Sequence, residues 1–423
     1  MSEEGRQRGH PEARERLHNA ETRVAAAAHD AVPALITGGA GDDPAGVVTY
    51  TIVGATTGFT QLWLLALITP MLAAATIMAG RVAIAARAGL AAVIAERYGR
   101  SVSLLVVLLL AIPNIATIAA DASGVASVLG IVTGLPWEVF VPVILIGLGL
   151  LLRRGYAQMK RILTMFTMVL LAYVAAALIA RPDWAEVARS TLVPHVEFEK
   201  AWLIAALGLI GTTISPYMLF WQATEEVEEL EHGATIHAAS FDASIWIGMI
   251  YSNVVAFFII VAAASTIHSG GDGITTVADA ARALSPLHHF GQAAFVIGII
   301  AAGLLALPVL AASTAYAFAE VFGWREGLGV RDGTARAFYL VLAAALGGGA
   351  LISLLPDFEP AQALYYSQVL DGVLLPAILL ILLVLSNDRR IVGAGNRNPT
   401  WVNWMSGLAV LAALAADFAA LLT

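Results

Sequence analysis

The sequence predicts an all-α integral membrane protein with a single membrane domain. Hydrophobic residues make up 59% of the chain and charged residues 13%, and the mean hydropathy is +0.80. Apolar runs of about 20 residues, the length that spans a bilayer as a helix, recur along the whole chain. Two of these runs are interrupted midway by glycine and proline, which weaken helices. These observations exclude an ordinary soluble domain.

Residues 1–30 are polar and charged, so we expect a mobile cytosolic tail without a cleavable signal. Residues 31–423 are expected to form one domain of eleven helices, because no linker is long enough to separate two soluble domains. The absence of cysteine excludes disulfides and thiolate metal sites. The predicted helices lie near 32–57, 60–80, 101–122, 136–152, 161–180, 201–224, 242–267, 291–322, 335–354, 362–386 and 401–422.

The distribution of the 23 lysine and arginine residues predicts the orientation. With the N-terminus in the cytoplasm, nearly all of them fall in the tail or in cytoplasmic connections, as the positive-inside rule requires. An odd number of helices then places the C-terminus outside. The alanine-rich composition suggests a bacterial inner membrane. Only four basic residues fall outside: Arg181, Arg189, Lys200 and Arg282.

The first interruption is the stretch Gly-Gly-Ala-Gly-Asp-Asp-Pro-Ala-Gly at 38–46, inside the first apolar run. Two adjacent carboxylates, Asp42 and Asp43, are expensive to place within a membrane span. A helix break that carries acidic groups therefore indicates an ion site. The alternative is a helix end with Asp42 or Asp43 as its N-cap.

The sixth run supplies a second break, where glycine, threonine and serine crowd before Pro216. It contains Gly208, Gly211, Thr212 and Ser215. Paired broken helices in corresponding positions of two halves are typical of inverted-repeat transporters, whose sites lie at the bilayer midplane. Unwound backbone there frees carbonyl groups to bind a cation.

At these residues the sequence resembles the Nramp family of divalent-metal transporters, and more closely its magnesium-transporting branch. Asp-Pro-Ala-Gly at 43–46 stands where the family has Asp-Pro-Gly-Asn, and Ser-Pro-Tyr at 215–217 stands where it has Met-Pro-His. The connector RVAIAARAGLAAVIAERYG and the eighth and tenth helices are also similar. The resemblance implies a LeuT-like fold, with helices 1–5 and 6–10 as inverted repeats and an eleventh helix appended.

The departures from the family pattern favour Mg²⁺. Ser215 offers a hard oxygen where the family has a soft thioether, and Gly46 leaves room where it has an asparagine. Mg²⁺ sheds water reluctantly and prefers oxygen ligands, whereas a thioether selects softer ions. The alternative is that Ser215 only fills space at a site that still prefers Mn²⁺.

Six positions are candidates for the metal site. Asp43 is the first choice, since its carboxylate supplies charge at the break, and Asp42 is either an outer acceptor or a hydrated carboxylate. The resemblance adds the carbonyl of Thr212 and the side chain of Gln368, which has an alternative as a hydrogen bond between helices. Gly46 and Ser215 complete the set.

The family's proton relay is eroded in this sequence. Its acidic residue, aspartate and glutamate of helix 3 correspond to Asn114, Asp121 and Gly124, so only Asp121 remains. Its helix-6 histidines correspond to Tyr217 and Gln222, which do not titrate near neutral pH. Arg336 could still partner Asp121. We therefore expect transport that is not obligatorily coupled to protons.

The runner-up function is a proton-coupled Mn²⁺ or Fe²⁺ symporter of the ordinary Nramp type. An amino-acid/Na⁺ symporter ranks lower, because the Asp42–Asp43 pair would repel a substrate carboxylate. An enzyme is not expected, since no catalytic motif lies within the helices, and neither is a cofactor or a nucleic-acid partner. The bilayer and a divalent cation are the expected partners, and a monomer is compatible with the sequence.

Several acidic residues remain open to two interpretations. The run from Glu225 to Glu231 follows the sixth helix and either concentrates cations at the inner mouth or forms a solvated turn. Asp371 and Glu320, each in an apolar run, are either cavity-facing charges or interfacial groups.

Overall fold

The structure is a computed structural model that describes residues 42–152, 168–231, 238–270, 273–328, 330, 333–393 and 397–422. Within these ranges the chain is helical and contains no strand. The expected tail at 1–30, residues 32–41 of the first predicted helix and residues 161–167 of the fifth lie outside the described residues.

The described elements include one broken pair, α10 and α11, which together form the expected sixth helix. In chain order they are α2 (Pro44–Thr57), α3 (Leu62–Ala86), α4 (Leu90–Tyr98), α5 (Arg100–Thr133), η1 (Trp137–Val139), α6 (Phe140–Leu152), η2 (Met168–Leu171), α8 (Ala172–Ala180), α9 (Trp184–Leu192), α10 (Lys200–Thr213), α11 (Pro216–Glu231), α12 (Ala238–Thr266), η3 (His268–Gly270), α13 (Val277–Ala280), η4 (Ala281–Leu287), α14 (His289–Phe322), α15 (Arg336–Ser353), α16 (Pro360–Asn387), α17 (Arg389–Val392) and α18 (Thr400–Leu422).

Eight helical spans in the described ranges are long and apolar enough to cross a membrane, which confirms a multi-pass membrane protein. They comprise α3, α5, the pair α10–α11, α12, α14, α15, α16 and α18. The remaining predicted spans correspond to the shorter helices α2, η1–α6 and α8.

Two helices continue further than the sequence suggested. Helix α5 runs to Thr133, since Gly124 and Gly130 do not interrupt it, and ends at Gly134 with a left-handed φ of 74°. Helix α11 runs to Glu231, so the glutamate run belongs to a helix rather than to a turn. Its first two carboxylates, Glu225 and Glu226, are buried, which corrects the expectation of a solvated turn.

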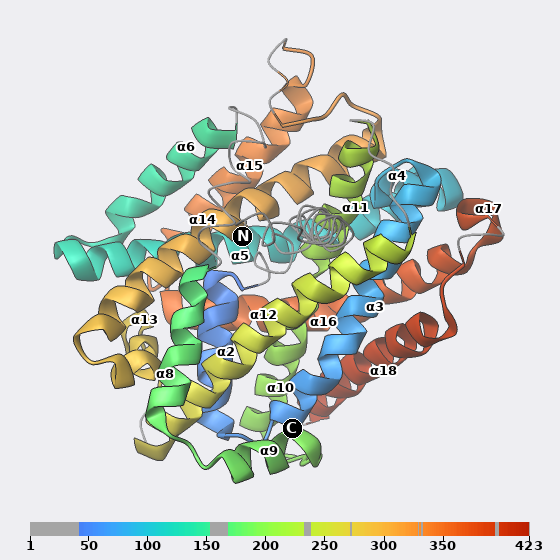
Figure 1. Cartoon of the computed structure of the whole chain (residues 1–423). Helices are drawn as coiled ribbons and strands as arrows, with labels where there is room; N and C mark the ends of the chain where they lie inside the picture. The colour runs from blue at the N-terminus through green and yellow to red at the C-terminus, as the bar shows by residue number, and fades with distance from the viewer. Residues whose placement is uncertain are drawn as a thin grey trace, which may run out of the picture.

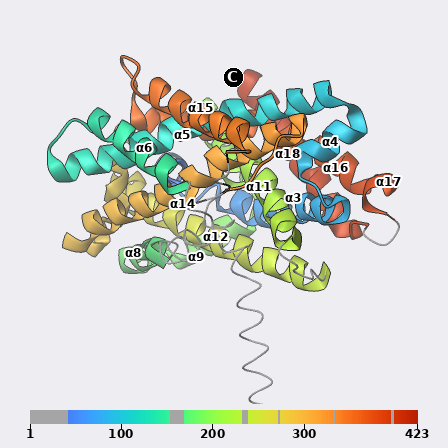
Figure 2. The same cartoon turned by 90° about the horizontal axis from the view of Figure 1, so that it is seen from above.

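The helices that carry the candidate residues lie in the middle of the bundle. Helix α2 packs against α12, α10 and α16, and α10 packs against α16. Figure 1 shows these four helices near the centre of the view, and α6 and α17 lie on opposite sides of the bundle in Figures 1 and 2. The pair α10–α11 is almost entirely buried, whereas α18 is mostly exposed.

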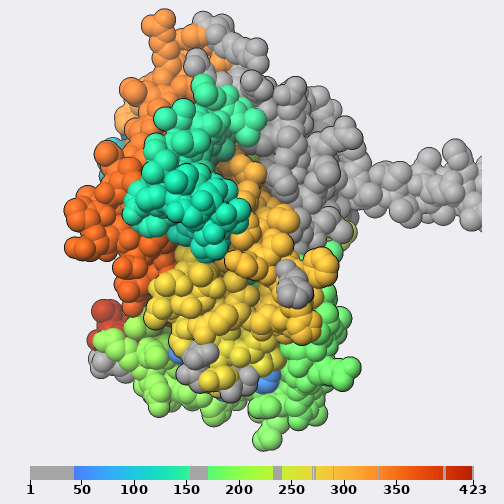
Figure 3. Space-filling view, turned by 90° about the vertical axis from the view of Figure 1, so that its left-hand side faces the viewer, coloured from blue at the N-terminus to red at the C-terminus, as the bar shows by residue number. Residues whose placement is uncertain are grey.

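The outer helices present apolar side chains to their surroundings, as a lipid-facing surface requires. On α6 the side chains of Val143, Ile146 and Leu150 are exposed, and on α15 those of Leu340 and Leu351 are exposed. Figure 3 shows α6 (teal) on this face of the molecule, beside α15 (orange).

Candidate metal site at the helix breaks

Asp43 lies at the start of α2 and is its N-cap. Its backbone is extended (φ −66°, ψ 169°), its side chain accepts a hydrogen bond from the Gly46 backbone N–H, and Pro44 occupies the first helical position. This arrangement satisfies an N–H group that a helix start leaves unpaired. The sequence-based alternative, that Asp43 is an N-cap, is therefore correct. The capping hydrogen bond holds the Asp43 carboxylate at the start of α2.

The second break separates α10 from α11 at Ile214 and Ser215. Ile214 leaves the helical conformation (φ −111°, ψ 63°), and Pro216 begins the next helix because it needs no N–H partner there. The Ser215 hydroxyl donates to the carbonyl oxygens of Gly211 and Thr212, at 3.0 and 3.1 Å. The paired break in helix 6 is as the sequence predicted.

Side chains connect the two breaks directly. The Tyr217 hydroxyl on α11 donates to Oδ2 of Asp43 at 3.2 Å, and the hydroxyls of Tyr50 on α2 and Thr213 on α10 lie 3.4 Å apart. All four side chains are buried. The start of α2 and the junction of α10 with α11 therefore lie side by side, although they are far apart in the sequence.

Asp42 faces a different helix from Asp43. Its Oδ1 accepts a hydrogen bond from Ser252 on α12 at 3.1 Å, and its Oδ2 has no partner among the described residues. Asp42 is fully buried, so a hydrated surface carboxylate is excluded. It stands beside the Asp43 carboxylate, on the α12 side of the break.

Helix α16 contacts the α10 break through its backbone. A methyl group added at Gly211 would lie 2.0 Å from the carbonyl oxygen of Gln368 and 2.4 Å from the nitrogen of Gly372. The backbone of Gln368 therefore lies against Gly211, the residue before Thr212. The Oε1 atom of Gln368 is buried and has no partner among the described residues.

Two further carboxylates, which the sequence did not place in the metal site, lie nearby. Asp121 on α5 accepts a hydrogen bond from the Ala45 backbone N–H at 2.9 Å, and Asp371 lies on α16. Both are fully buried and close enough to Asp43 to repel its charge. The signal that could have identified Asp371 is its spacing from Gln368, since positions three apart share a helix face.

The site is rich in oxygen atoms that lack donors. Unpartnered buried oxygens are uncommon in folded proteins, and here α2, α5, α10 and α16 carry them, together with Asp42 just before α2. A cation would satisfy them. Among the described residues, however, no three carboxylates or histidines are close enough to hold a bare metal ion. The unpartnered atoms are Oδ2 of Asp42, Oγ1 of Thr49, Oδ2 of Asp121, Oγ1 of Thr212, Oε1 of Gln368 and both carboxylate oxygens of Asp371.

Asn114 and Gly124 stand on α5 where the resembled family has acidic residues, and both make packing or hydrogen-bond contacts with other helices. The Asn114 amide donates to Thr314 at 2.8 Å and lies 3.3 Å from Ser313, both on α14. At Gly124 an added methyl group would lie 3.0 Å from the Leu364 side chain, so Leu364 fills the space that a longer side chain would need.

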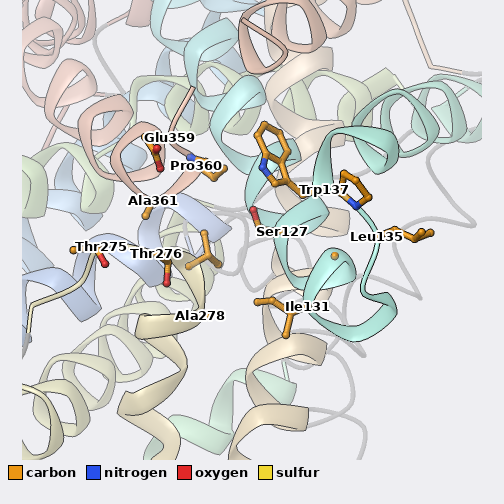
Figure 4. Close-up of a pocket in the computed structure, with 13 residues that line it drawn as sticks. Ser127, Ile131, Leu135, Trp137, Thr275, Thr276, Ala278, Glu359, Pro360 and Ala361 are labelled. Atoms are coloured by element: carbon orange, nitrogen blue, oxygen red, sulfur yellow. The ribbon is translucent and has the colours of Figure 1, made fainter. Parts of the chain in front are cut away.

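A cavity of about 470 Å³ lies beyond the site, between α5, α13 and the start of α16 (Figure 4). On α5 it begins at Ser127, about 9 Å past Asp121, and on α16 it begins at Ala361, about 10 Å before Gln368. The contact of Leu364 with Gly124 falls between the cavity and the site on both helices. In the predicted orientation this cavity is on the outer side.

At the other end of the bundle, carboxylates join α11, α14 and α4. Glu320 on α14 accepts hydrogen bonds from the backbone N–H groups of Ala91 and Ala92, at 2.9 and 3.3 Å, and thereby caps α4. The Tyr316 hydroxyl donates to Glu228, and the Gln222 amide donates to Glu226 at 2.6 Å. Glu320 is thus a half-buried cap of α4.

The chain is similar to bacterial proteins of one kind. It is 24% identical over 397 residues to the divalent metal cation transporter MntH of Granulibacter bethesdensis, covering 88% of this chain and 83% of that protein. It is 27% identical over 376 residues to the protein of the same name from Yersinia pestis (strain Pestoides F), covering 85% and 87%.

Solved structures confirm the fold. The manganese transporter of Eremococcus coleocola superimposes with a TM-score of 0.73 at 18% identity, covering 92% of this chain and 85% of that chain. Mhp1, a nucleobase-cation-symport-1 family transporter, gives 0.61 at 13% identity, covering 93% and 91%. Both are transporters, and the LeuT-like fold predicted from the resemblance is therefore correct. The model of the Nramp family (natural resistance-associated macrophage protein-like) matches residues 34–423, so the chain belongs to the Nramp family.

Proposed function

We propose that this protein is a membrane transporter of divalent cations whose ion binds between the two helix breaks. The observation that carries the proposal is the position of Asp43: its carboxylate caps α2 and accepts a hydrogen bond from Tyr217 of α11. A buried carboxylate at the junction of two broken helices attracts a cation and has carbonyl groups beside it. The relatives named above as metal transporters support the same function.

In this proposal the ion is held by oxygen atoms from three helices. Asp43 contributes the charge, and Asp42 adds a second carboxylate beside Asp43. The carbonyl of Thr212 and the amide oxygen of Gln368 are the other proposed ligands. Gly46 and Ser215 leave the space that a larger side chain would fill. Alternating access would open this site first to one side of the membrane and then to the other.

The outer cavity offers the approach from outside. Leu364, seated on Gly124, separates the cavity from the carboxylates and would serve as the closed outer gate. On the opposite side, the buried Glu225 and Glu226 give the exit a negative potential that favours cations. The proposed orientation has the N-terminus in the cytoplasm of a bacterial cell and the C-terminus outside.

We propose Mg²⁺ as the main substrate, with Mn²⁺ also transported. Ser215 occupies the position where the resembled family has a thioether, and the candidate side-chain and carbonyl ligands offer oxygen. Such a site suits a hard cation that retains part of its water. A soft-ion carrier would gain selectivity from a thioether, which this break lacks.

We propose further that transport is not obligatorily coupled to protons. Leu364 fills the space next to Gly124, Asn114 is held by hydrogen bonds to α14, and Tyr217 and Gln222 do not change charge near neutral pH. The second candidate is a proton-coupled Mn²⁺ or Fe²⁺ symporter. Its support is Asp121, which is retained and bonded to the Ala45 N–H beside Asp43.

The test is transport by the purified protein in liposomes, with a pH-sensitive dye inside. We expect Mg²⁺ and Mn²⁺ uptake, competition of Mn²⁺ uptake by millimolar Mg²⁺, and no acidification of the lumen. Acidification driven by the Mg²⁺ gradient would establish proton coupling, and lack of competition would favour the Mn²⁺/Fe²⁺ candidate.

The site itself is tested with Asp43→Ala, which should abolish uptake of both ions while the protein remains folded. Asp417→Asn is the matched control, because it removes a carboxylate near the end of α18, a span that is mostly exposed. Uptake retained in the Asp43→Ala protein would remove the whole site assignment.

A further inference from the structure

Asp371 is a buried carboxylate that neither caps a helix nor accepts a hydrogen bond among the described residues. It lies in the middle of α16 with an exposed fraction of 0%, and neither of its carboxylate oxygens has a hydrogen-bond partner among the described residues. Burying a carboxylate without a partner is strongly unfavourable, so such a group is retained only where something compensates it. By contrast, Asp42, Asp43 and Asp121 each accept at least one hydrogen bond from the protein.

The turn of α16 that carries Asp371 is fixed against the α10 break. Gly372 lies so close to α10 that an added methyl group would be 2.6 Å from the carbonyl oxygen of Leu207. Gly211 approaches the backbone of Gln368 and Gly372 in the same way. Gln368 is three residues before Asp371 and shares its face of the helix. Asp371 is therefore one helical turn from a candidate ligand, on the same face.

Charged and polar groups of three other helices face Asp371. Asp43 of α2, Asp121 of α5 and the Tyr217 hydroxyl of α11 all interact with it electrostatically. The carboxylates are near enough to repel one another, yet no three are close enough to hold a bare ion among the described residues.

We propose that Asp371 is a further carboxylate of the transport site and that it binds the divalent cation through the cation's coordinated water. A water molecule bound to a metal ion donates its protons, and Asp371 offers two oxygens that need donors. Mg²⁺ usually keeps several of its waters in protein sites, so a carboxylate such as Asp371 can bind the ion through a coordinated water without contacting it directly. This inference rests on the proposed function and adds a residue that determines hydrated-ion binding.

Asp371→Asn tests the proposal because it keeps the size of the side chain and removes the charge. We expect the half-saturation concentration for Mg²⁺ uptake to rise by about 10–100-fold, the usual effect of losing a partner of a metal's ligands. Hexaamminecobalt(III) is the second probe, since its six ammine ligands do not exchange and it imitates a hydrated cation. It should inhibit the wild-type protein and should inhibit Asp371→Asn much less.

The controls separate this inference from the proposed function. Asp417→Asn should behave as the wild type in both measurements, and Asp43→Ala should not transport. Unchanged Mg²⁺ half-saturation and unchanged inhibition in Asp371→Asn, with Asp43→Ala inactive, would overturn the role of Asp371 and leave the proposed function standing. Transport by Asp43→Ala would instead overturn the proposed function.

Folding is checked by size-exclusion chromatography and by the thermal shift that Mg²⁺ causes in the detergent-solubilised protein. A folded Asp371→Asn protein with a weaker Mg²⁺-induced shift supports the proposal, and an equal shift contradicts it. If Asp371→Asn does not fold, Asp371→Ser is judged by the same two criteria, since its smaller side chain relieves any steric conflict.

Discussion

The Tyr217 hydroxyl donates to the Asp43 carboxylate at 3.2 Å and joins the two helix breaks. Tyr217 is the residue after Pro216, the first residue of α11, and Asp43 is the residue before α2. The hydrogen bond therefore connects the start of α2 with the start of α11. It fixes the direction in which Asp43 presents its charge.

Tyr217→Phe should raise the half-saturation concentration for Mg²⁺ by about tenfold, because one hydrogen bond to a charged group contributes on this order. The maximal rate should change less. The measurement is initial uptake into liposomes over a range of Mg²⁺ concentrations. Tyr173→Phe on α8 is the control, since the Tyr173 hydroxyl is buried without a partner among the described residues. Equal effects of the two variants would show that Tyr217 acts only through packing.

Ser215→Met should shift selectivity from Mg²⁺ toward Mn²⁺. The substitution places a thioether at the break and removes a hydroxyl that holds the carbonyls of Gly211 and Thr212. The measurement is the ratio of Mn²⁺ to Mg²⁺ uptake, which a general loss of folded protein would leave unchanged. A ratio equal to that of the wild type would show that Ser215 does not set selectivity.

Gly211→Ala should destabilise the protein by about 1–3 kcal/mol or more, because its methyl group would overlap backbone atoms that cannot rotate away. The nearest atom is the Gln368 carbonyl oxygen at 2.0 Å. Gly407→Ala on α18 is the matched control: no atom lies within 4 Å of its added methyl group. Thermal unfolding in detergent should separate the two, and equal melting temperatures would contradict the close helix contact.

Asp279 should contribute pH-dependent stability to the segment that lines the outer cavity. Burial alone would raise its pKa, but hydrogen bonds from Thr275 and Thr276 outweigh this and lower the pKa of Asp279 to about 2. A depressed pKa means that the contribution is complete above the ordinary value of 3.8 and disappears as the pH falls toward 2.

Asp279→Ala should therefore lose about 1 kcal/mol above pH 4, the usual cost of removing a helix cap. The difference from the wild type should shrink as the pH approaches 2. Hydrogen exchange of residues 273–287 at several pH values is the measurement. A difference that persists at pH 2 would show that the carboxylate charge is not responsible.

Glu326, in the connection between α14 and α15, should destabilise the folded protein at alkaline pH. Burial, followed by the nearby carboxylates of Glu320, Glu228 and Glu231, raises the pKa of Glu326 to about 9. The folded state therefore holds a proton that the unfolded state releases above about pH 4.5, so the wild type loses stability as the pH rises from there to about 9.

Glu326→Gln imitates the protonated form and avoids this loss. Its melting temperature should equal that of the wild type near pH 4 and should exceed it at pH 8. Melting curves at the two pH values suffice. A variant that is equally stable at pH 8 would indicate that Glu326 is solvated in the folded protein.

The helical framework followed from the sequence because membrane spans leave a strong and simple signal. Apolar length located the spans, and the glycine and proline at 208–216 located the break between α10 and α11. Helix ends were less predictable: α5 continues through Gly124 because Leu364 packs on that glycine, a contact between distant segments that spacing does not reveal.

The site was predictable only in part. Asp43 stood out because its acid group interrupts an apolar run, and Gln368 came from the family resemblance. The involvement of Asp371 depends on the backbone contact between α10 and α16, which brings its turn to the break. Its spacing of three residues from Gln368 places Asp371 on the same helix face, but this spacing alone does not separate a ligand from an interfacial group.

Gly211 and Gly372 remove the layer of side chains that normally keeps two helices 8–10 Å apart. Because the two backbones are in direct contact here, α10 cannot shift or rotate against α16 without a steric clash. We therefore expect α10 and α16 to move together. A conformational change of helix 6 during transport should therefore change the backbone dihedral angles of Ile214 and Ser215, the two residues between α10 and α11.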